Sequence, residues 1–205
     1  MRLGEYQKLV VIKKVEFGVY LAERMENETR VLLPEKQVPE GTKEGDEIEV
    51  FVYKDSMDRI ISTTRRPLLV MDEMAVLTVK EKTRIGAFLD WGLEKDLLLP
   101  FKEQTTHVEK GDTCLTALYV DKSNRLAATM RVYDYLSCDS PYVKDSAVQG
   151  TVIEINPDYG VYVAVDDRYF GMIPKNEVFG KIQIGDTIHG RVSKVRDDHK
   201  LSISL

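Results

Sequence analysis

Apolar and polar side chains alternate over short stretches of this chain, and turn-forming residues separate these stretches. The pattern is clearest between residues 147 and 205, where β-branched residues are frequent and alternation indicates strands. A turn with Gly160 follows the first alternating stretch, and Pro174 ends the third and favours a single helical turn. The strands predicted here are 147–155, 161–165, 169–173, 187–195 and 200–205.

The same pattern occurs three times in the same order. The copies share a Gly before the second strand, a Pro after the third, and a Gly-Asp pair before the fourth. From the Pro to the Gly of that pair is 11 residues in every copy. The shared positions are Gly18, Pro34, Gly45-Asp46; Gly86, Pro100, Gly111-Asp112; and Gly160, Pro174, Gly185-Asp186. A constant spacing across three copies indicates a tandem array of small domains.

The OB-fold, a small Greek-key barrel, has five short strands in this order, with a helical turn between the third and the fourth. We therefore predict an all-β protein of three tandem five-stranded barrels, with domains at 1–66, 67–140 and 141–205. The first strands of the earlier copies are expected near Tyr6–Val15 and Met74–Lys82. Within the second linker, residues 133–136 favour a helical turn that packs on a neighbouring barrel.

The repeated residues have physical roles in such a barrel. Gly allows the sharp bend that a small barrel needs at a corner. Pro ends a strand without leaving an unused N–H group in the sheet. Asp after Gly can accept a hydrogen bond from its own turn and so open the long fourth strand.

The strings Phe17–Tyr20, Ile85–Phe88 and Tyr159–Tyr162, with the later Pro and Gly-Asp, resemble the S1 motif, an RNA-binding OB-fold. The longer string Gly86–Gln104 is similar to bacterial proteins of the conserved virulence factor B (YitL-like) family. That resemblance implies three S1-type domains and a C-terminal winged helix, in a protein that binds RNA and regulates gene expression. This chain stops at Leu205 without a winged helix, and we expect that such a domain has been removed from it.

The sequence departs from the S1 pattern at one position in every copy. S1 domains often carry a histidine at the end of the third strand, where this chain has Pro34, Pro100 and Pro174. The resemblance therefore does not imply a full-strength RNA site in each copy.

Composition excludes several classes of protein. Apolar residues make up 43% of the chain, which is too many for a disordered chain. The apolar runs are too short to span a membrane, and the N-terminus lacks a secretory signal, so we expect a cytoplasmic protein. Cys114 and Cys138 are far apart and without a paired Cys/His motif, which favours free thiols over a zinc site.

The candidates for catalysis are weak. His107, His189 and His199 have no Ser or Cys partner at a useful spacing, and no phosphate-binding loop is present. The pairs Asp166-Asp167 and Asp197-Asp198 fall in predicted hairpin turns, where Asp is common for conformational reasons. We expect no enzymatic activity, no cofactor and no metal.

An OB barrel binds single strands by stacking bases on aromatic residues of its second and third strands, while cations hold the phosphates. The alternative is that these rings fill the barrel. Rings three residues apart share a face only across a bulge, which the Gly would supply. Trp91 is equally compatible with a binding platform and with a cap on the barrel end. The candidate rings are Phe17, Tyr20, Phe88, Tyr159 and Tyr162.

Cations select the third copy as the main candidate. The net charge is −5, and no copy is basic overall. Copy three nevertheless gathers basic residues on its closing hairpin and on the neighbouring segment: Arg191, Lys194, Arg196, His199 and Lys200, with Lys175 and Arg168. In copy two, Lys80, Lys82 and Arg84 alternate on one predicted strand and so share a face. Such clusters are also common as solvated surface.

We expect the third copy to bind single-stranded RNA through Tyr159, Tyr162, Lys175, Arg191 and Lys194, with micromolar, salt-sensitive affinity. The first two copies would be weaker sites or a platform. The rival hypothesis is a scaffold that docks to translation or transcription machinery such as the ribosome, because OB barrels also bind proteins and the chain is acidic. Neither hypothesis involves a membrane or a small-molecule substrate.

Overall fold

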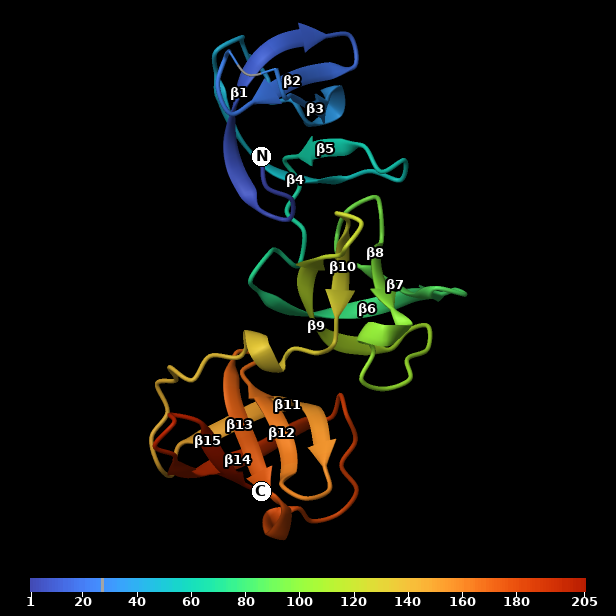
Figure 1. Ribbon diagram of the computed structural model, residues 1–205. Coiled ribbons are helices and arrows are strands. Elements are labelled where there is room, and N and C mark those ends of the chain that lie inside the picture. Colours follow the sequence, from blue (N-terminus) through green and yellow to red (C-terminus); the bar gives the residue numbers. More distant parts are fainter. Residues whose placement is uncertain (27) are drawn as a thin grey trace.

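The computed structural model describes residues 1–26 and 28–205 and consists of three β-barrels arranged one after another (Figure 1). Barrel 1 is closed, with strand order β1-β2-β3-β5-β4. Its strands β1 and β2 pair antiparallel, and β3 meets β5 in parallel. The strands of barrel 1 are β1 (Tyr6–Val15), β2 (Gly18–Ala22), β3 (Val31–Pro34), β4 (Glu47–Lys54) and β5 (Ile60–Thr63).

Barrel 3 repeats this topology and is also closed, with strand order β11-β12-β13-β15-β14. In barrel 2 the same order forms an open sheet, β10-β9-β6-β7-β8, with β10 and β8 at its edges. The strands of barrel 2 are β6 (Met74–Lys82), β7 (Gly86–Asp90), β8 (Leu97–Pro100), β9 (Thr113–Val120) and β10 (Leu126–Thr129). Those of barrel 3 are β11 (Ala147–Asn156), β12 (Gly160–Val165), β13 (Tyr169–Pro174), β14 (Thr187–Val195) and β15 (Leu201–Ser204).

The structure confirms the predicted all-β class and the OB-fold order. A single 3-10 turn follows the third strand of each barrel, directly after the Pro: η1 (Glu35–Gln37), η2 (Phe101–Glu103) and η4 (Lys175–Glu177). The backbone at these prolines is extended, with φ near −60°. Proline thus ends the strand at a φ that its ring already fixes.

Glycine is required before the second strand of every barrel. Gly18, Gly86 and Gly160 have φ values of 147°, 150° and 130°. A Cβ atom at Gly86 would lie 2.2 Å from the carbonyl oxygen of Leu99, and the other two glycines have an equivalent clash. The second and third strands can therefore cross closely only with glycine at this corner.

The repeated Asp closes the turn that precedes the fourth strand. The carboxylates of Asp46, Asp112 and Asp186 each accept a hydrogen bond from the backbone N–H three residues earlier, at 2.7, 2.7 and 2.8 Å. The role expected for the Gly-Asp pair is confirmed in all three copies.

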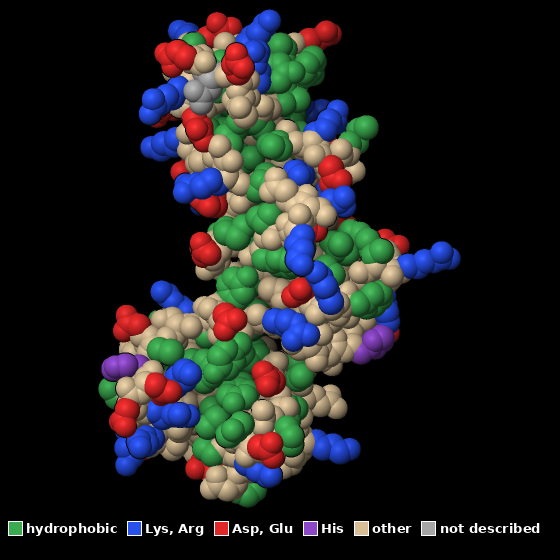
Figure 2. Space-filling view, viewed as in Figure 1, with side chains coloured by type: hydrophobic (Ala, Val, Ile, Leu, Met, Phe, Trp, Pro, Cys, Tyr) green, Lys and Arg blue, Asp and Glu red, His purple; other side chains and the backbone are tan. Residues whose placement is uncertain are grey.

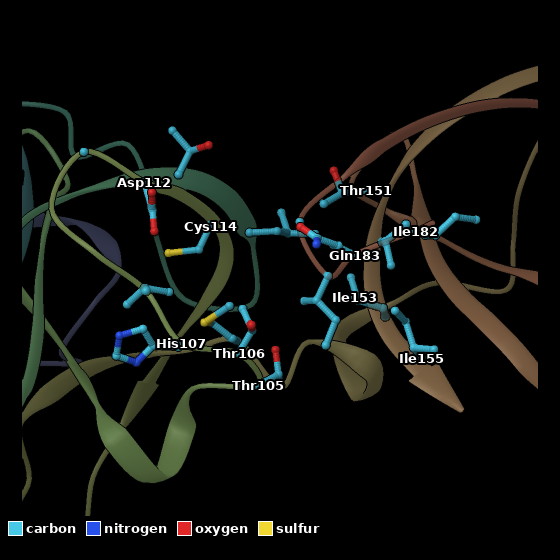
Figure 3. Close-up of a pocket in the computed structure, with 18 residues that line it drawn as sticks. Thr105, Thr106, His107, Asp112, Cys114, Thr151, Ile153, Ile155, Ile182 and Gln183 are labelled. Carbon is cyan, nitrogen blue, oxygen red and sulfur yellow. The ribbon is translucent and has the colours of Figure 1, made fainter. Parts of the chain in front are cut away.

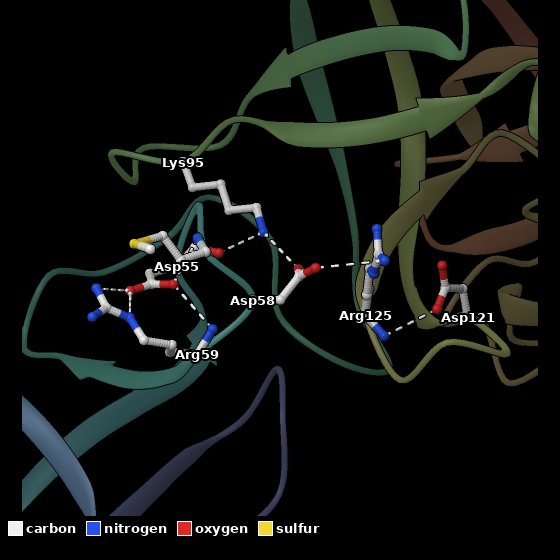
Figure 4. A network of polar contacts seen from close by, with 7 residues as sticks. Asp55, Asp58, Arg59, Lys95, Asp121 and Arg125 are labelled. Carbon is white, nitrogen blue, oxygen red and sulfur yellow. Dashed lines mark hydrogen bonds and ion pairs between the residues drawn. The ribbon is translucent and has the colours of Figure 1, made fainter.

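The hydrophobic core of barrel 2 extends into barrel 1, which also has a core of its own. Phe51 and Tyr53 of β4 pack with Leu69, Trp91 and Leu93 of barrel 2 in the same buried cluster. A chain of polar contacts lies at the junction of the two barrels (Figure 4). In it, Lys95 donates to the backbone carbonyl of Asp55 at 2.8 Å, and Asp58 lies 3.5 Å from Arg125 and 3.6 Å from Lys95.

A second apolar cluster joins barrels 2 and 3. It consists of Leu115, Ala117, Val132, Ile153 and Ala164, with Tyr135, Leu136 and Tyr162 packed against it. The linker forms a 3-10 turn, η3 (Tyr133–Tyr135), which confirms the predicted helical turn against a neighbouring barrel. After this turn, Ser137 exchanges backbone hydrogen bonds with Arg168 and Phe170 and so adds to the edge of β13.

Both cysteines are free, and Cys114 is buried. Within residues 1–26 and 28–205, no three His, Cys, Asp or Glu side chains are grouped so as to hold a metal ion. In the same residues no helix has the length and apolar character needed to cross a membrane.

Candidate nucleic-acid interface

One row of side chains crosses the outer face of barrel 3. Cross-strand partners point to the same side of a sheet, and the register pairs Tyr162 with Met172, Met172 with Ser202, and Ser202 with Lys194. At about 4.8 Å per strand, the row from Tyr162 to Lys194 spans about 14 Å. Its neighbours in sequence, Val161 and Ile173, are buried inside the barrel. The row thus presents one aromatic ring and one cation with apolar and hydroxyl groups between them.

The next row lies toward the end of the barrel where η4 is found. Arg191 pairs with Ser204, and its guanidinium donates to the backbone carbonyl of Asp145 at 3.3 Å. Tyr159 precedes β12 and is 65% exposed, and its carbonyl accepts a hydrogen bond from the Lys175 N–H at 3.1 Å. Lys175 is exposed. Arg191 therefore lies one row from Lys194, and Tyr159 and Lys175 adjoin each other just beyond the ends of β12 and β13.

The tyrosine of the first row belongs to a cluster of three rings. Tyr162 meets Tyr133 and Phe170 edge-to-face, with ring centroids 5.7 and 5.9 Å apart, and Tyr133 lies 4.8 Å from Phe170. Lys200 lies over Phe170 at 4.4 Å and over Tyr133 at 5.7 Å. An ammonium over aromatic faces is a favourable cation–π contact. The cluster therefore holds a cation beside exposed ring surface.

Burial raises the pKa of the Tyr162 phenol, and the neighbouring Tyr133, Glu154 and Tyr159 raise it further. Tyr162 therefore stays neutral at physiological pH. The register from Gly160 to Tyr162 is continuous against β11, and the bulge falls instead on β11, between Val152 and Glu154. The bulge that we considered at the glycine is therefore absent from β12.

Acidic side chains limit the charge of this face. Glu154 is the cross-strand partner of Tyr162 and is exposed. Asp198 pairs with Arg196 at 3.3 Å and with Lys200 at 3.8 Å. Lys194, in contrast, forms no ion pair within the described part of the chain. Lys194 is thus a cation that remains available to a ligand.

Figure 2 shows this face directly. Hydrophobic side chains cover the front of the lowest barrel, over β12 and β13, and Lys and Arg side chains lie along one margin and above it. The surface is an apolar patch bordered by both basic and acidic side chains rather than a continuous basic groove. Such a surface suits ligands that combine flat rings with negative charge.

The corresponding row in barrel 1 is apolar. Tyr20 pairs with Leu32, which meets Ile61 in parallel, and Ile61 pairs with Tyr53. Tyr53 occupies the position that corresponds to Lys194, and it is buried against barrel 2. Phe17 is 57% exposed and meets Tyr20 edge-to-face at 6.3 Å, and Arg30 lies over the Tyr20 ring at 5.9 Å.

Barrel 2 offers the smallest set of candidates. Phe88 pairs with Leu98 and is half-buried, and Arg84 is exposed in the turn after β6. Lys80 binds Asp96 at 2.8 Å, while Lys82 binds Glu109 at 2.7 Å and His107 at 2.9 Å. The three cations were predicted to alternate on one strand and share a face, but β6 ends at Lys82. Two of them are instead neutralised by separate carboxylates.

Two rings of the aromatic cluster, Tyr133 and Phe170, were absent from the predicted site, and Lys200 was counted among the cations of copy three but was not placed in the site. Tyr133 comes from the linker, and only its place in a predicted helical turn next to a barrel indicated a contact. Phe170 is 4% exposed and reads as a core residue in sequence. Trp91, for which a platform and a cap were both considered, is 2% exposed and lies between barrels 1 and 2.

Comparison with known proteins agrees with this architecture. The profile of the S1 domain matches residues 3–65 and 73–131, and that of the S1 RNA binding domain matches residues 142–205. The uncharacterized protein YitL of Bacillus subtilis is 28% identical over all of this chain, which covers 70% of that protein. Conserved virulence factor B of Staphylococcus aureus is 21% identical over 78% of the chain, which spans 56% of that protein.

A solved structure has the same fold. It is a multidomain protein with nucleic acid binding domains from Streptococcus pneumoniae, with a TM-score of 0.64 and 19% identity. The match covers 99% of this chain and 73% of the solved one.

Proposed function

We propose that this chain, which belongs to the S1 domain family, binds single-stranded RNA on the outer face of barrel 3. S1 domains are nucleic-acid-binding modules rather than catalytic ones. The observation that carries the proposal is the row from Tyr162 to Lys194, bordered by Tyr159, Lys175 and Arg191. It combines rings for stacking with cations for phosphates on one exposed side of one barrel.

Each residue has a distinct part in this binding. Tyr159 and Tyr162 offer ring surface, and stacking contributes about 1–3 kcal/mol per base without selecting a sequence. Lys194, Arg191 and Lys175 contact phosphates at the margin of the apolar patch. Three phosphate contacts give a moderate salt dependence, which fits micromolar rather than nanomolar affinity.

Barrels 1 and 2 support this site as a platform and supply weaker contacts through Phe17, Tyr20, Phe88 and Arg84. Weak sites on one chain gain affinity by effective concentration when their faces align. We further propose that RNA binding regulates gene expression, in contact with the ribosome or the transcription machinery.

A titration against single-stranded RNA, single-stranded DNA and duplexes tests the proposal. We expect micromolar affinity for single strands that falls as salt rises from about 50 to 300 mM. Tyr162→Ala should weaken binding about tenfold, as the loss of one stack implies. Tyr162→Phe keeps the ring and serves as the folding control. Tyr20→Ala, at the equivalent position of barrel 1, should have a smaller effect.

Two results would contradict this function. One is salt-independent affinity over that range, and the other is native affinity in a folded Tyr162→Ala variant. The apolar centre of the patch favours a second candidate, a docking surface for another protein of the translation or transcription machinery. In that case none of the nucleic acids would bind at micromolar concentration.

A further inference from the structure

A cleft lies between barrels 2 and 3, beside the linker turn η3 (Figure 3). Its volume is about 810 Å³, which lies within the range of roughly 300–1,000 Å³ typical of pockets for small organic ligands. The wall from barrel 2 includes Thr105, Thr106 and His107, and the wall from barrel 3 includes Ile153, Ile155 and Gln183. Both walls belong to the folded barrels, so the cleft exists without a ligand.

The chemistry of the walls favours a neutral, flat, hydrogen-bonding ligand. No Lys or Arg is among the described residues that line the cleft, so it is not built for phosphate. Its one carboxylate, Asp112, already accepts a hydrogen bond from the Glu109 N–H. The other polar side chains of the cleft are threonine, histidine and glutamine, and isoleucine side chains form its apolar surface. This is the composition of a site for a nucleobase, whose faces are apolar and whose edges carry donors and acceptors.

One polar atom of the cleft has no partner. The Thr105 hydroxyl is buried and forms no hydrogen bond with any described residue of the chain. A buried hydroxyl without a partner is unfavourable, so such groups usually mark a place where something else binds. In Figure 3 this hydroxyl and the Gln183 side chain both point into the gap.

The cleft is continuous with the outer face of barrel 3. Ile153 and Ile155 of the cleft flank Glu154 on β11, and Glu154 is the cross-strand partner of Tyr162. A strand lying on the Tyr162 row therefore needs to cross only β11 to reach the cleft. Ile155 is 44% exposed and is the cross-strand partner of Val161, so it faces the cleft from the side of β11 opposite to Glu154.

We infer that the cleft between barrels 2 and 3 receives one unstacked nucleobase of the single strand bound to barrel 3. This inference depends on the proposed function and adds to it a base-reading site. The rows on barrel 3 bind any base by its face, whereas the cleft contacts the base edge through Thr105 and Gln183. The protein would thus prefer some bases at one position of the strand.

Filling the cleft tests the inference. Thr106 is an exposed residue of the cleft wall, and Thr106→Trp should weaken binding of single-stranded RNA about tenfold. Glu40→Trp is the matched control, since Glu40 precedes Thr106 by 66 residues, as Pro34 precedes Pro100. An oligonucleotide that lacks one base should bind wild type more weakly than the intact strand, and only when the missing base is at one particular position of the strand. Thr106→Trp should bind this abasic oligonucleotide as well as it binds the intact strand.

The hydroxyl has its own test. Thr105→Val should lower RNA affinity several-fold while leaving Tm unchanged or higher, because the hydroxyl has no partner among residues 1–26 and 28–205. If the hydroxyl had a purely structural role, Thr105→Val would lower Tm. Photo-crosslinking of RNA containing 4-thiouridine should label the segment 105–115 or 182–185.

The outcomes separate the two proposals. RNA binding that Thr106→Trp leaves unchanged, with crosslinks confined to β12–β15, would overturn the cleft and leave the barrel face standing. Absence of RNA binding by wild type would overturn both. Binding of a peptide in place of RNA in the cleft would likewise overturn this inference.

Discussion

Trp91 of barrel 2 lies edge-on against Phe51 of barrel 1, with ring centroids 5.8 Å apart and planes at 76°. Tyr53 completes the contact at 6.3 Å from the same indole, whose N–H donates to the Lys95 carbonyl. The only tryptophan of the chain thus joins two domains through a fully satisfied, buried contact. Barrels 1 and 2 should therefore unfold as one cooperative unit.

Replacing Trp91 by alanine should break that unit. We expect a loss of about 3–5 kcal/mol in the free energy of unfolding, as for other large core aromatics. Denaturation followed by circular dichroism should then show separate transitions for barrels 1 and 2. Phe101→Ala, at a ring that is 47% exposed, should cost much less. A single transition with native midpoint in Trp91→Ala would contradict the core contact between the two barrels.

The ion pairs around the same junction should matter far less. Asp58 lies 3.6 Å from Lys95 and 3.5 Å from Arg125, and all three side chains are substantially exposed (Figure 4). Exposed pairs usually contribute less than about 1 kcal/mol. Asp58→Asn keeps a residue that tolerates the left-handed φ of 59° and should lower stability by that amount or less. A double-mutant cycle with Arg125→Gln measures the coupling, and a coupling comparable to the Trp91 effect would refute this ranking.

The corner glycine of barrel 2 should be irreplaceable. A Cβ at Gly86 would meet a backbone oxygen at 2.2 Å, so Gly86→Ala should cost more than about 4 kcal/mol and unfold barrel 2. Gly111 also has a positive φ, 94°, but its Cβ would meet no atom within 4 Å. Gly111→Ala should therefore cost only about 1–3 kcal/mol. Urea denaturation of both variants measures the two losses in the free energy of unfolding. Equal losses would show that the positive φ, and not the clash of the Cβ atom, determines the cost of the substitution.

Lys194 should account for one phosphate contact. Its conversion to glutamine should reduce the slope of log affinity against log salt by about 0.7, the value for one phosphate of a single strand. Lys122→Gln, an exposed cation in the closing turn of barrel 2, is the matched control and should leave the slope unchanged. Equal slopes for Lys194→Gln and wild type would remove Lys194 from the interface.

The buried thiol of Cys114 gives a pH dependence. Burial raises its pKa from 9.0 to about 11, with a smaller contribution from Asp112. The folded state thus holds the proton more tightly than the unfolded state. The stabilisation is complete below pH 9 and is lost as the pH rises toward 11, by on the order of 2–3 kcal/mol.

Comparison of wild type with Cys114→Ala isolates the contribution of the Cys114 thiol to the loss of stability at alkaline pH. The variant should lose less stability than wild type between pH 9 and 11. In native protein at pH 8, Ellman's reagent should react with Cys138 and leave Cys114 unmodified. Fast reaction of both thiols would contradict the burial.

The local architecture was readable in the sequence because it depends on short-range physics. Alternation set which side of each strand is buried, and Gly18, Gly86 and Gly160 were recognisable because only glycine fits that corner. The first strands Tyr6–Val15 and Met74–Lys82 have the predicted bounds. Each of these features depends on residues within a single repeat, which the sequence displays together.

The assembly of the barrels depended on contacts between repeats. Phe51, Ala117 and Arg191 each lie six residues after the Gly of the Gly-Asp pair. The first is buried against barrel 2, the second against barrel 3, and the third is exposed. Sequence reveals this equivalence but not which surface becomes an interface.

The candidate site divides in the same way. Sequence alone proposed Tyr159, Tyr162, Arg191 and Lys194 as candidates within one repeat, but alternation places residues three apart on opposite faces unless a bulge lies between them. The bulge between Val192 and Lys194 is visible only in the structure. Only the tertiary structure brought the linker ring of Tyr133 against Tyr162 and Phe170 and opened a cleft between two barrels. Such contacts join residues distant in the chain, and their geometry is set by how whole barrels pack rather than by any local pattern.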